Sequence, residues 1–69
     1  HIASFEIRRD GVNYEELKGV SPVLFVKRGN EIIYDLEGKT LRSGDRVYVL
    51  IDHNSLEKFR EKIGALNSA

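Results

Sequence analysis

The sequence predicts an α+β fold: a small, mostly antiparallel sheet with a short helical turn after its first strand and one C-terminal helix. Three observations lead to this prediction. Four short segments show strand-type patterning, turn residues separate them, and the apolar spacing becomes helical only after the fourth segment. The predicted order of elements is therefore β-α-β-β-β-α.

The first expected strand is Ser4–Arg8, in which apolar and polar side chains alternate as they do in a strand with one exposed face. Asp10–Gly11 forms the turn that ends it. Tyr14–Leu17 fits a single helical turn, with Asn13 as its cap and Gly19 at its end.

The next two strands are expected to form a hairpin. Val23–Val26 is a continuous apolar run, which is typical of a strand buried on both faces. Gly29 and Asn30 tolerate positive φ angles, so Lys27–Glu31 is expected to be a tight connection. Ile32–Tyr34 is the returning strand.

The fourth strand, Arg46–Ile51, is β-branched and aromatic, and it is apolar on both faces, so it is expected to be central in the sheet. The preceding stretch, Leu36–Gly44, contains two glycines and is expected to be a loop. Leu36 and Leu41 are its expected inward anchors.

After the fourth strand, one apolar stripe follows a helical spacing: Leu56, Phe59 and Ile63. We expect this stripe to pack on the sheet. Asn54 and Glu57 have the spacing of an N-cap and capping box, and Gly64 is expected at the C′ position that ends the helix.

The chain contains no methionine, which indicates one domain taken from a longer protein. Residues 4–66 are expected to form this single domain. Residues 1–3 are expected to be a tag remnant or a frayed terminus and residues 67–69 a second frayed terminus, because both ends are small and polar.

The composition of the 69 residues excludes several classes of protein. Eleven Lys and Arg balance eleven Asp and Glu, whereas a dedicated nucleic-acid binder usually has a basic excess. Without cysteine the chain has neither a disulfide framework nor a cysteine zinc site. No apolar run approaches the length of a membrane span, so no direct membrane insertion is expected.

A chain of this length has little stability to spare. Apolar burial contributes ~105 kcal/mol, and ordering the chain costs about the same at ~1.5 kcal/mol per residue. Since the two nearly cancel and the strands offer more apolar faces than one helix covers, a second copy of the chain is the expected source of further stability.

No arrangement of side chains predicts an enzyme. His53 is the only internal histidine, and its sequence neighbours Ser43, Asp45 and Ser55 are of the types expected in turns. Asp45 and Asp52 flank one strand ~20 Å apart, too far for joint acid–base work. With two histidines, no cysteine and scattered carboxylates, no metal site is expected either.

Two short basic pairs, Arg8–Arg9 and Lys27–Arg28, are interpreted as solvated edges. They form an anion pocket only if the first strand lies beside the hairpin. Gly38–Thr40 resembles the end of a phosphate-binding P-loop, but the upstream glycine and the following helix are missing.

Three stretches carry a resemblance to a known family: Val26–Ile33, Leu41–Leu50 and Leu56–Phe59. They give an apolar strand, an Arg-Gly hairpin, a returning strand, the pattern L-x-x-G-D-x-hydrophobic-x-hydrophobic, and a closing L-x-x-F helix. From Pro22 to Gly64 this order resembles the C-terminal subdomain of the regulator-of-potassium-conductance family, the TrkA-C or RCK-C type. The most specific part of the pattern is Leu41–Asp45. There Gly44 permits the turn, and the side chain of Asp45 can accept hydrogen bonds from nearby backbone amides.

The resemblance implies a cytoplasmic regulatory domain associated with a potassium channel, transporter or antiporter. Its implied partners are a second copy, as a homodimer, and a membrane potassium-transport subunit or domain of the parent protein, with no nucleic acid. The implied effector is a nucleotide such as cyclic di-AMP or a cation, bound in the dimer cleft. Polar loop side chains are expected to reach it: Asn13, Tyr14, Arg28 and Asn30.

A second interpretation is a β-grasp-like module of the TGS type that binds RNA or protein. The Gly44–Asp45 strand entry and the two basic pairs favour it, while the zero net charge opposes phosphate binding. A structural domain without a ligand is the third interpretation.

Overall fold

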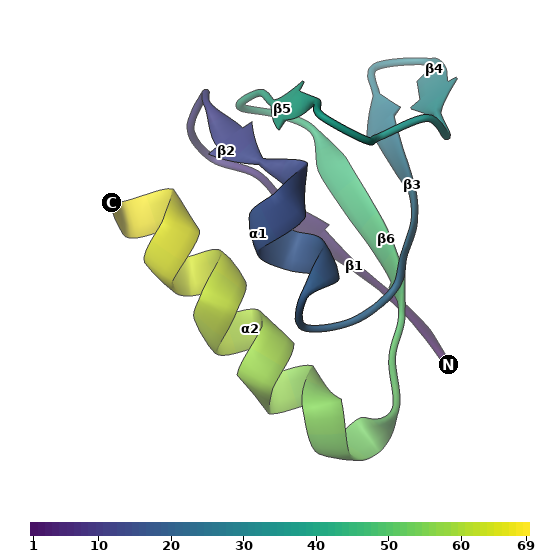
Figure 1. Ribbon diagram of the computed structural model, residues 1–69, viewed down its shortest axis with the longest axis vertical. Helices are drawn as coiled ribbons and strands as arrows, with labels where there is room; N and C mark the ends of the chain where they lie inside the picture. Colours follow the sequence, from purple (N-terminus) through teal and green to yellow (C-terminus); the bar gives the residue numbers. More distant parts are fainter.

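The computed structural model describes residues 1–69 and confirms the α+β class, with two sheets and two helices. Strands of the main sheet run antiparallel in the order β1-β6-β3-β4, formed by Ile2–Glu6, Arg46–Leu50, Val23–Arg28 and Glu31–Ile33. A small second sheet, which the sequence did not predict, pairs β2 (Val12–Asn13) with β5 (Thr40–Leu41), which lies inside the segment Leu36–Gly44 that was expected to be a loop. The helices are α1 (Tyr14–Lys18) and α2 (His53–Ser68), and α2 extends along the sheet in Figure 1.

The strand Arg46–Leu50 is central, as its composition predicts, because β6 pairs with β1 on one side and with β3 on the other. Its Val47 and Val49 are completely buried. Paired residues on neighbouring strands share a face, so Phe5, opposite Val47, and Ala3, opposite Val49, also point inward.

The hydrophobic core lies between this inner face and the two helices. From α2 it receives Phe59 and Ile63, as the stripe predicts, and the Phe59 ring centroid lies 5.1 Å from that of Phe5. Leu17 enters it from α1. The loop anchors Leu36 and Leu41 are also buried, as expected.

The prediction that Val23–Val26 is buried on both faces is wrong. Val26 alone in this run is fully buried, whereas Leu24 is exposed. An irregularity between Val23 and Phe25 shifts the register against β6. The physical reason for the exposure is that the helices cover only the inner face of the sheet.

The predicted ends of the C-terminal helix are also wrong. Asp52, not Asn54, is the N-cap, and its Oδ1 accepts a hydrogen bond of 2.8 Å from the Ser55 amide. Gly64 lies inside the helix rather than after it. The helix continues to Ser68 because its last turn buries another core residue, Leu66.

The ends expected to be frayed belong to regular elements. Ile2 and Ala3 lie in β1 and Asn67 lies in α2. Asn67 joins the two elements, because its Oδ1 accepts from the Arg8 amide at 2.8 Å and its Nδ2 donates to the Glu6 carbonyl at 3.0 Å. These side-chain bonds attach the last turn of α2 to the C-terminal end of β1 and to the residues after it, while Ile2 and Ala3 pair with Leu50 and Val49 of β6.

Candidate functional site

A bidentate ion pair fixes the end of β3 to the turn before β6. Arg28 Nε donates to Asp45 Oδ1 at 2.9 Å, and Arg28 Nη2 donates to Asp45 Oδ2 at 2.8 Å. Asp45 is only 1% exposed, and its Oδ2 also accepts from the Arg42 amide at 2.8 Å. The turn expected at Gly44 is confirmed, with a φ of +93° that favours glycine.

Burial is the largest single influence on Asp45 and acts to raise the pKa of its carboxyl. The hydrogen bonds from Arg28 and from the Arg42 amide, with the charges of both side chains, outweigh it and lower the pKa below the ordinary value. Asp45 is therefore ionised in the folded chain at neutral pH. Its hydrogen bond in turn raises the pKa of Arg28, against the effect of partial burial.

A small cavity lies beside this ion pair, between β4 and β5, with a volume of about 160 Å³. Its charged lining residues are Arg28, Glu31 and Lys39. The remaining lining consists of Thr40 and three apolar residues: Ile33, Leu36 and Leu41. Of the three hollows on the surface it is the most enclosed.

The four residues expected to bind a ligand fall into two pairs. Arg28 and Asn30 belong to the β3–β4 hairpin, where Arg28 lines the cavity and Asn30 is exposed at the turn. Asn13 and Tyr14 belong to the junction of β2 and α1. Strand β5 lies between the pairs, as Figure 1 shows.

The second pair reaches β5 through the backbone. Asn13 is the register partner of Thr40, and the Tyr14 amide donates to the Lys39 carbonyl at 3.1 Å. Asn13 occupies the N-cap position of α1 as expected, but its side chain makes no capping hydrogen bond. The structure thus brings only Arg28 of the four into the lining of the cavity.

Lys18 connects α1 to the loop that leads to β5. Its Nζ lies 3.0 Å from Glu15 Oε2 and 3.2 Å from Glu37 Oε1, and 5.8 Å from the ring centroid of Tyr14. The hydrogen bond with Glu15, followed by that with Glu37, raises the pKa of Lys18, and the hydrogen bond with Lys18 lowers the pKa of Glu15. This contact places a cation over the ring of Tyr14.

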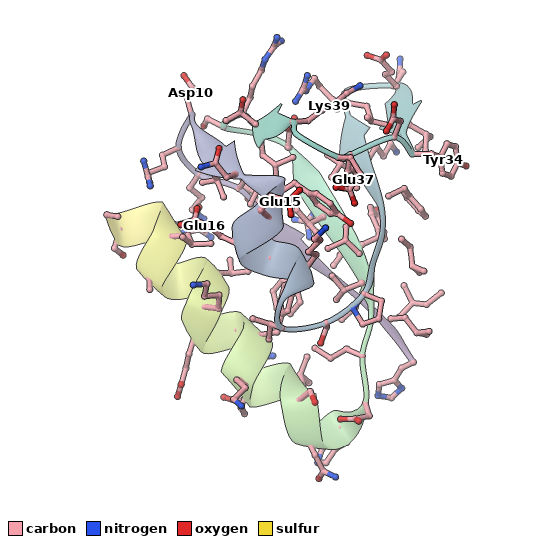
Figure 2. All side chains as sticks on the ribbon, viewed as in Figure 1. Asp10, Glu15, Glu16, Tyr34, Glu37 and Lys39 are labelled. Atoms are coloured by element: carbon pink, nitrogen blue, oxygen red, sulfur yellow. The ribbon has the colours of Figure 1, made fainter.

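An apolar surface without a partner lies on the outer face of the main sheet. We define the outer face by the residues that point away from both helices: Ile2, Ser4, Glu6, Phe25, Lys27, Ile32, Tyr34, Arg46, Tyr48 and Leu50. Ile2 is 65% exposed, Leu50 50% and Tyr34 72%. Figure 2 shows Tyr34 at the edge of the molecule opposite the helices.

Three aromatic rings form a row across the middle of the outer face, and we call it the aromatic row: Tyr34, Phe25 and Tyr48. The ring centroids of Phe25 and Tyr48 lie 4.7 Å apart in a stacked arrangement, and those of Phe25 and Tyr34 lie 5.8 Å apart. Charged residues lie at one end of the strands, where Glu6 pairs with Arg46 and Arg46 with Lys27. Ile2 and Leu50 lie at the other end.

The sequence interpretation missed both the aromatic row and the cavity residues Glu31 and Lys39. The alternation of Tyr48 with Val47 and Val49 was the available signal for the row, because it places the tyrosine on the face opposite the two valines. No sequence signal joins Glu31 to Lys39, since the fold of the β4–β5 loop places them together.

Three findings bear on function more broadly. No group of three or more His, Cys, Asp or Glu side chains is placed to hold a metal ion. Neither helix has both the length and the apolar character that crossing a membrane requires. Comparisons with protein-family models, with curated proteins and with solved structures find no match to this chain.

Proposed function

We propose that this chain is a regulatory domain that dimerises through the outer face of its main sheet. The observation that carries the proposal is the apolar outer face itself, with its aromatic row and the exposed Ile2 and Leu50. Apolar patches of a few hundred Å² are the largest that monomeric proteins usually expose, and they are often functional. A second copy covers it and adds the apolar burial that a short chain lacks.

The arrangement of the outer face fits a two-fold contact. An axis along the aromatic row lays the row of one copy on the row of the other, as a self-complementary interface requires. The charged ends, with Lys27 and Arg46, then lie on opposite sides of the axis, so their like charges stay apart. Glu6, beside Arg46, reduces the positive charge of each end.

The size of the outer face sets the expected strength of the dimer. Four strands ~4.8 Å apart, with five residues ~3.4 Å apart, outline ~320 Å² on each copy. A standard interface takes ~800 Å² per partner, and smaller ones are typical of weak or transient contacts. We therefore expect a weak, transient dimer, which suits a dimer that an effector shifts.

The resemblance to the regulator-of-potassium-conductance family supplies the proposed setting: a cytoplasmic domain of a potassium channel, transporter or antiporter. A nucleotide such as cyclic di-AMP, or a cation, bound between two copies favours one dimer geometry, and the attached membrane protein responds to it by population shift. The order of the larger elements, β1, α1, β3, β4, β6 and α2, is compatible with this proposal, while the short strands β2 and β5 are additions to the expected order.

Sedimentation velocity over a concentration series from ten to several hundred micromolar tests the dimer. The wild-type chain is expected to move from monomer to dimer across this range, and Tyr34→Asp and Leu50→Asp to stay monomeric. Ala65→Asp is the matched control, because Ala65 is exposed on α2, away from the outer face. A wild-type chain that stays monomeric throughout, or a control that dissociates as well, overturns the proposal.

One observation favours a second candidate function, binding of RNA by the same face. Lys27 and Arg46 lie next to the aromatic row, and exposed aromatics beside cations on a four-stranded sheet are a known platform for single-stranded bases. Binding of single-stranded RNA that weakens steeply with salt, and that Tyr34→Asp abolishes, would favour this function over dimerisation.

A further inference from the structure

The cavity between β4 and β5 is too small for a nucleotide. Its volume of about 160 Å³ corresponds to ~5 water molecules at ~30 Å³ each. Clefts for drug-sized ligands take ~300–1,000 Å³. The occupant must therefore be a small molecule, and a cyclic dinucleotide has to bind elsewhere on the dimer.

The charges around the cavity balance, which argues against a simple anion or cation as its occupant. Arg28 and Lys39 contribute two positive charges, while Glu31 and the buried Asp45 contribute two negative ones. A phosphate would meet the Glu31 carboxylate, and a metal cation would meet Arg28 and Lys39. A ligand that carries both signs at once satisfies both sides.

Arg28 is held in place before any ligand arrives. Asp45 engages its Nε and Nη2, and no hydrogen bond within the chain uses Nη1. A guanidinium has five N–H donors in a fixed plane, so the unused ones keep a defined direction. Held by a buried carboxylate in this way, Arg28 is a preorganised partner for a ligand carboxylate, and Lys39 adds a second cation.

The negative charge that a ligand ammonium group requires comes from the β3–β4 hairpin. Glu31 is the register partner of Arg28 and is close enough for its charge to raise the Arg28 pKa. Its carboxylate offers acceptors for a ligand ammonium group, and the Thr40 hydroxyl offers a further donor and acceptor. The apolar part of the lining, Ile33, Leu36 and Leu41, is left for a hydrocarbon side chain.

We infer that this cavity binds a free α-amino acid with a small aliphatic side chain. Its carboxylate lies against Arg28 and Lys39, its ammonium group against Glu31, and its side chain on the three apolar residues. A single copy of the chain forms the whole cavity, so binding of the amino acid does not require a dimer. It rests on the proposed function only for its consequence, in which the amino acid acts as an effector of the regulatory dimer beside or in place of a nucleotide.

Titration of the ¹⁵N-labelled chain with L-valine, followed by NMR, tests the inference. L-valine is expected to shift the amide signals of residues 28–41 with a dissociation constant below ten millimolar. L-valinamide, which lacks the carboxylate, and N-acetyl-L-valine, which lacks the ammonium group, are expected to bind at least tenfold more weakly. The inference is overturned if either derivative binds as tightly as L-valine. It is also overturned if neither L-valine nor L-leucine shifts these amide signals at concentrations up to fifty millimolar.

Two variants on the surface test the assigned roles without touching the core. Glu31→Gln and Lys39→Gln are each expected to weaken L-valine binding at least fivefold, because each removes one charge from the lining. Glu61→Gln and Lys58→Gln are the matched controls on α2 and are expected to leave the affinity unchanged. Thermal melts check that all four remain folded, and unchanged affinity in the folded cavity variants overturns the inference.

Repeating the titration with Tyr34→Asp separates the inference from the proposed function. If the outer face forms the dimer, this variant is monomeric and still binds L-valine, because the cavity belongs to one chain. If the wild-type chain is monomeric but binds L-valine, the dimer proposal fails and the cavity assignment stands. If inorganic phosphate shifts residues 28–41 and L-valine does not, the cavity assignment fails whatever the oligomeric state.

Discussion

The inner and outer faces of the main sheet carry similar residues and have opposite surroundings. On β6, Val47 and Val49 are completely buried, whereas Leu50, on the other face, is half exposed. On β3, Val26 is buried and the neighbouring Phe25 belongs to the aromatic row. The difference lies in what covers each face: α2 packs on one, and nothing in the chain packs on the other.

Neighbouring basic residues show the same contrast. Arg28 points to the inner side, where a buried carboxylate binds it in a bidentate pair, and Lys27 lies on the outer face opposite Arg46. The type of a residue, apolar or charged, therefore does not by itself predict whether it is buried, paired or exposed. Alternation along the strand assigns the face, and the element packed against that face assigns the role.

The strongest test of this contrast truncates one aromatic residue on each face. Phe59→Ala, on the inner side, is expected to cost about 3–5 kcal/mol, because it removes a ring packed against Phe5 and leaves a cavity. Tyr34→Ala, on the outer face, is expected to change the stability of the monomer by less than about 0.5 kcal/mol. Urea unfolding at a concentration below the dimer range measures both.

A domain of this size has only about 3–5 kcal/mol of stability, so Phe59→Ala is expected to be largely unfolded. Ile63→Val, which costs about 0.5–1.5 kcal/mol, keeps the inner-face measurement within range. Similar losses from Ile63→Val and Tyr34→Ala would show that the outer face is packed in the monomer and that the two faces do not differ.

The two basic neighbours on β3 give the next test. Arg28→Met is expected to cost about 3–5 kcal/mol, since it leaves the buried Asp45 carboxylate without its partner, and therefore to be largely unfolded like Phe59→Ala. Lys27→Met, the matched control, is expected to change stability by less than about 0.5 kcal/mol. Thermal or urea unfolding compares the two, and equal effects would contradict the assigned role of the ion pair.

The Arg28–Asp45 ion pair is also expected to make the stability of the chain depend on pH in acid. Because folding lowers the pKa of Asp45, the stability it contributes is present above the unfolded pKa of about 3.9 and is lost as the pH falls through the folded value. Urea midpoints measured from pH 7 down to pH 2 are expected to fall below about pH 4. In Asp45→Asn this fall should be smaller; an identical acid dependence would contradict the assignment.

The smallest expected effect distinguishes the observed helix cap from the predicted one. Asp52→Ala is expected to cost about 1 kcal/mol, because it removes the acceptor for the Ser55 amide. Asn54→Ala, at the position that the sequence pattern favours, is expected to cost less than about 0.5 kcal/mol. A larger loss from Asn54→Ala, measured by thermal unfolding, would restore the sequence prediction.

Much of the fold followed from local pattern. The strand type of Arg46–Leu50, the Gly29–Asn30 hairpin and the inward position of Leu41 could be predicted because each depends on neighbouring residues in the sequence. The helix cap at Asp52 was missed because Asp and Asn are both favourable N-cap residues. Which of Asp52 and Asn54 caps the helix depends on the residue at which β6 ends.

The candidate sites were less accessible to sequence reasoning. Arg28 was expected at a ligand, and it lines the cavity, but its bond to Asp45 spans 17 positions that no local pattern connects. Asn13 and Tyr14 were grouped with Arg28 because all three were expected to be polar loop residues. In the structure, β5 lies between Arg28 and these two residues. Residues far apart in sequence meet only after the loops fold.

The class of fold, the strand at Arg46–Leu50 and the helical character of the C-terminal segment follow from local sequence, because propensity and alternation act over a few residues. The face of the sheet that α2 covers, and the pairing of Arg28 with the buried carboxylate of Asp45, are visible only in the folded chain. These depend on contacts between distant segments, where packing of the whole chain outweighs local preference. The aromatic row on the uncovered face and the charge-balanced cavity are both products of that packing.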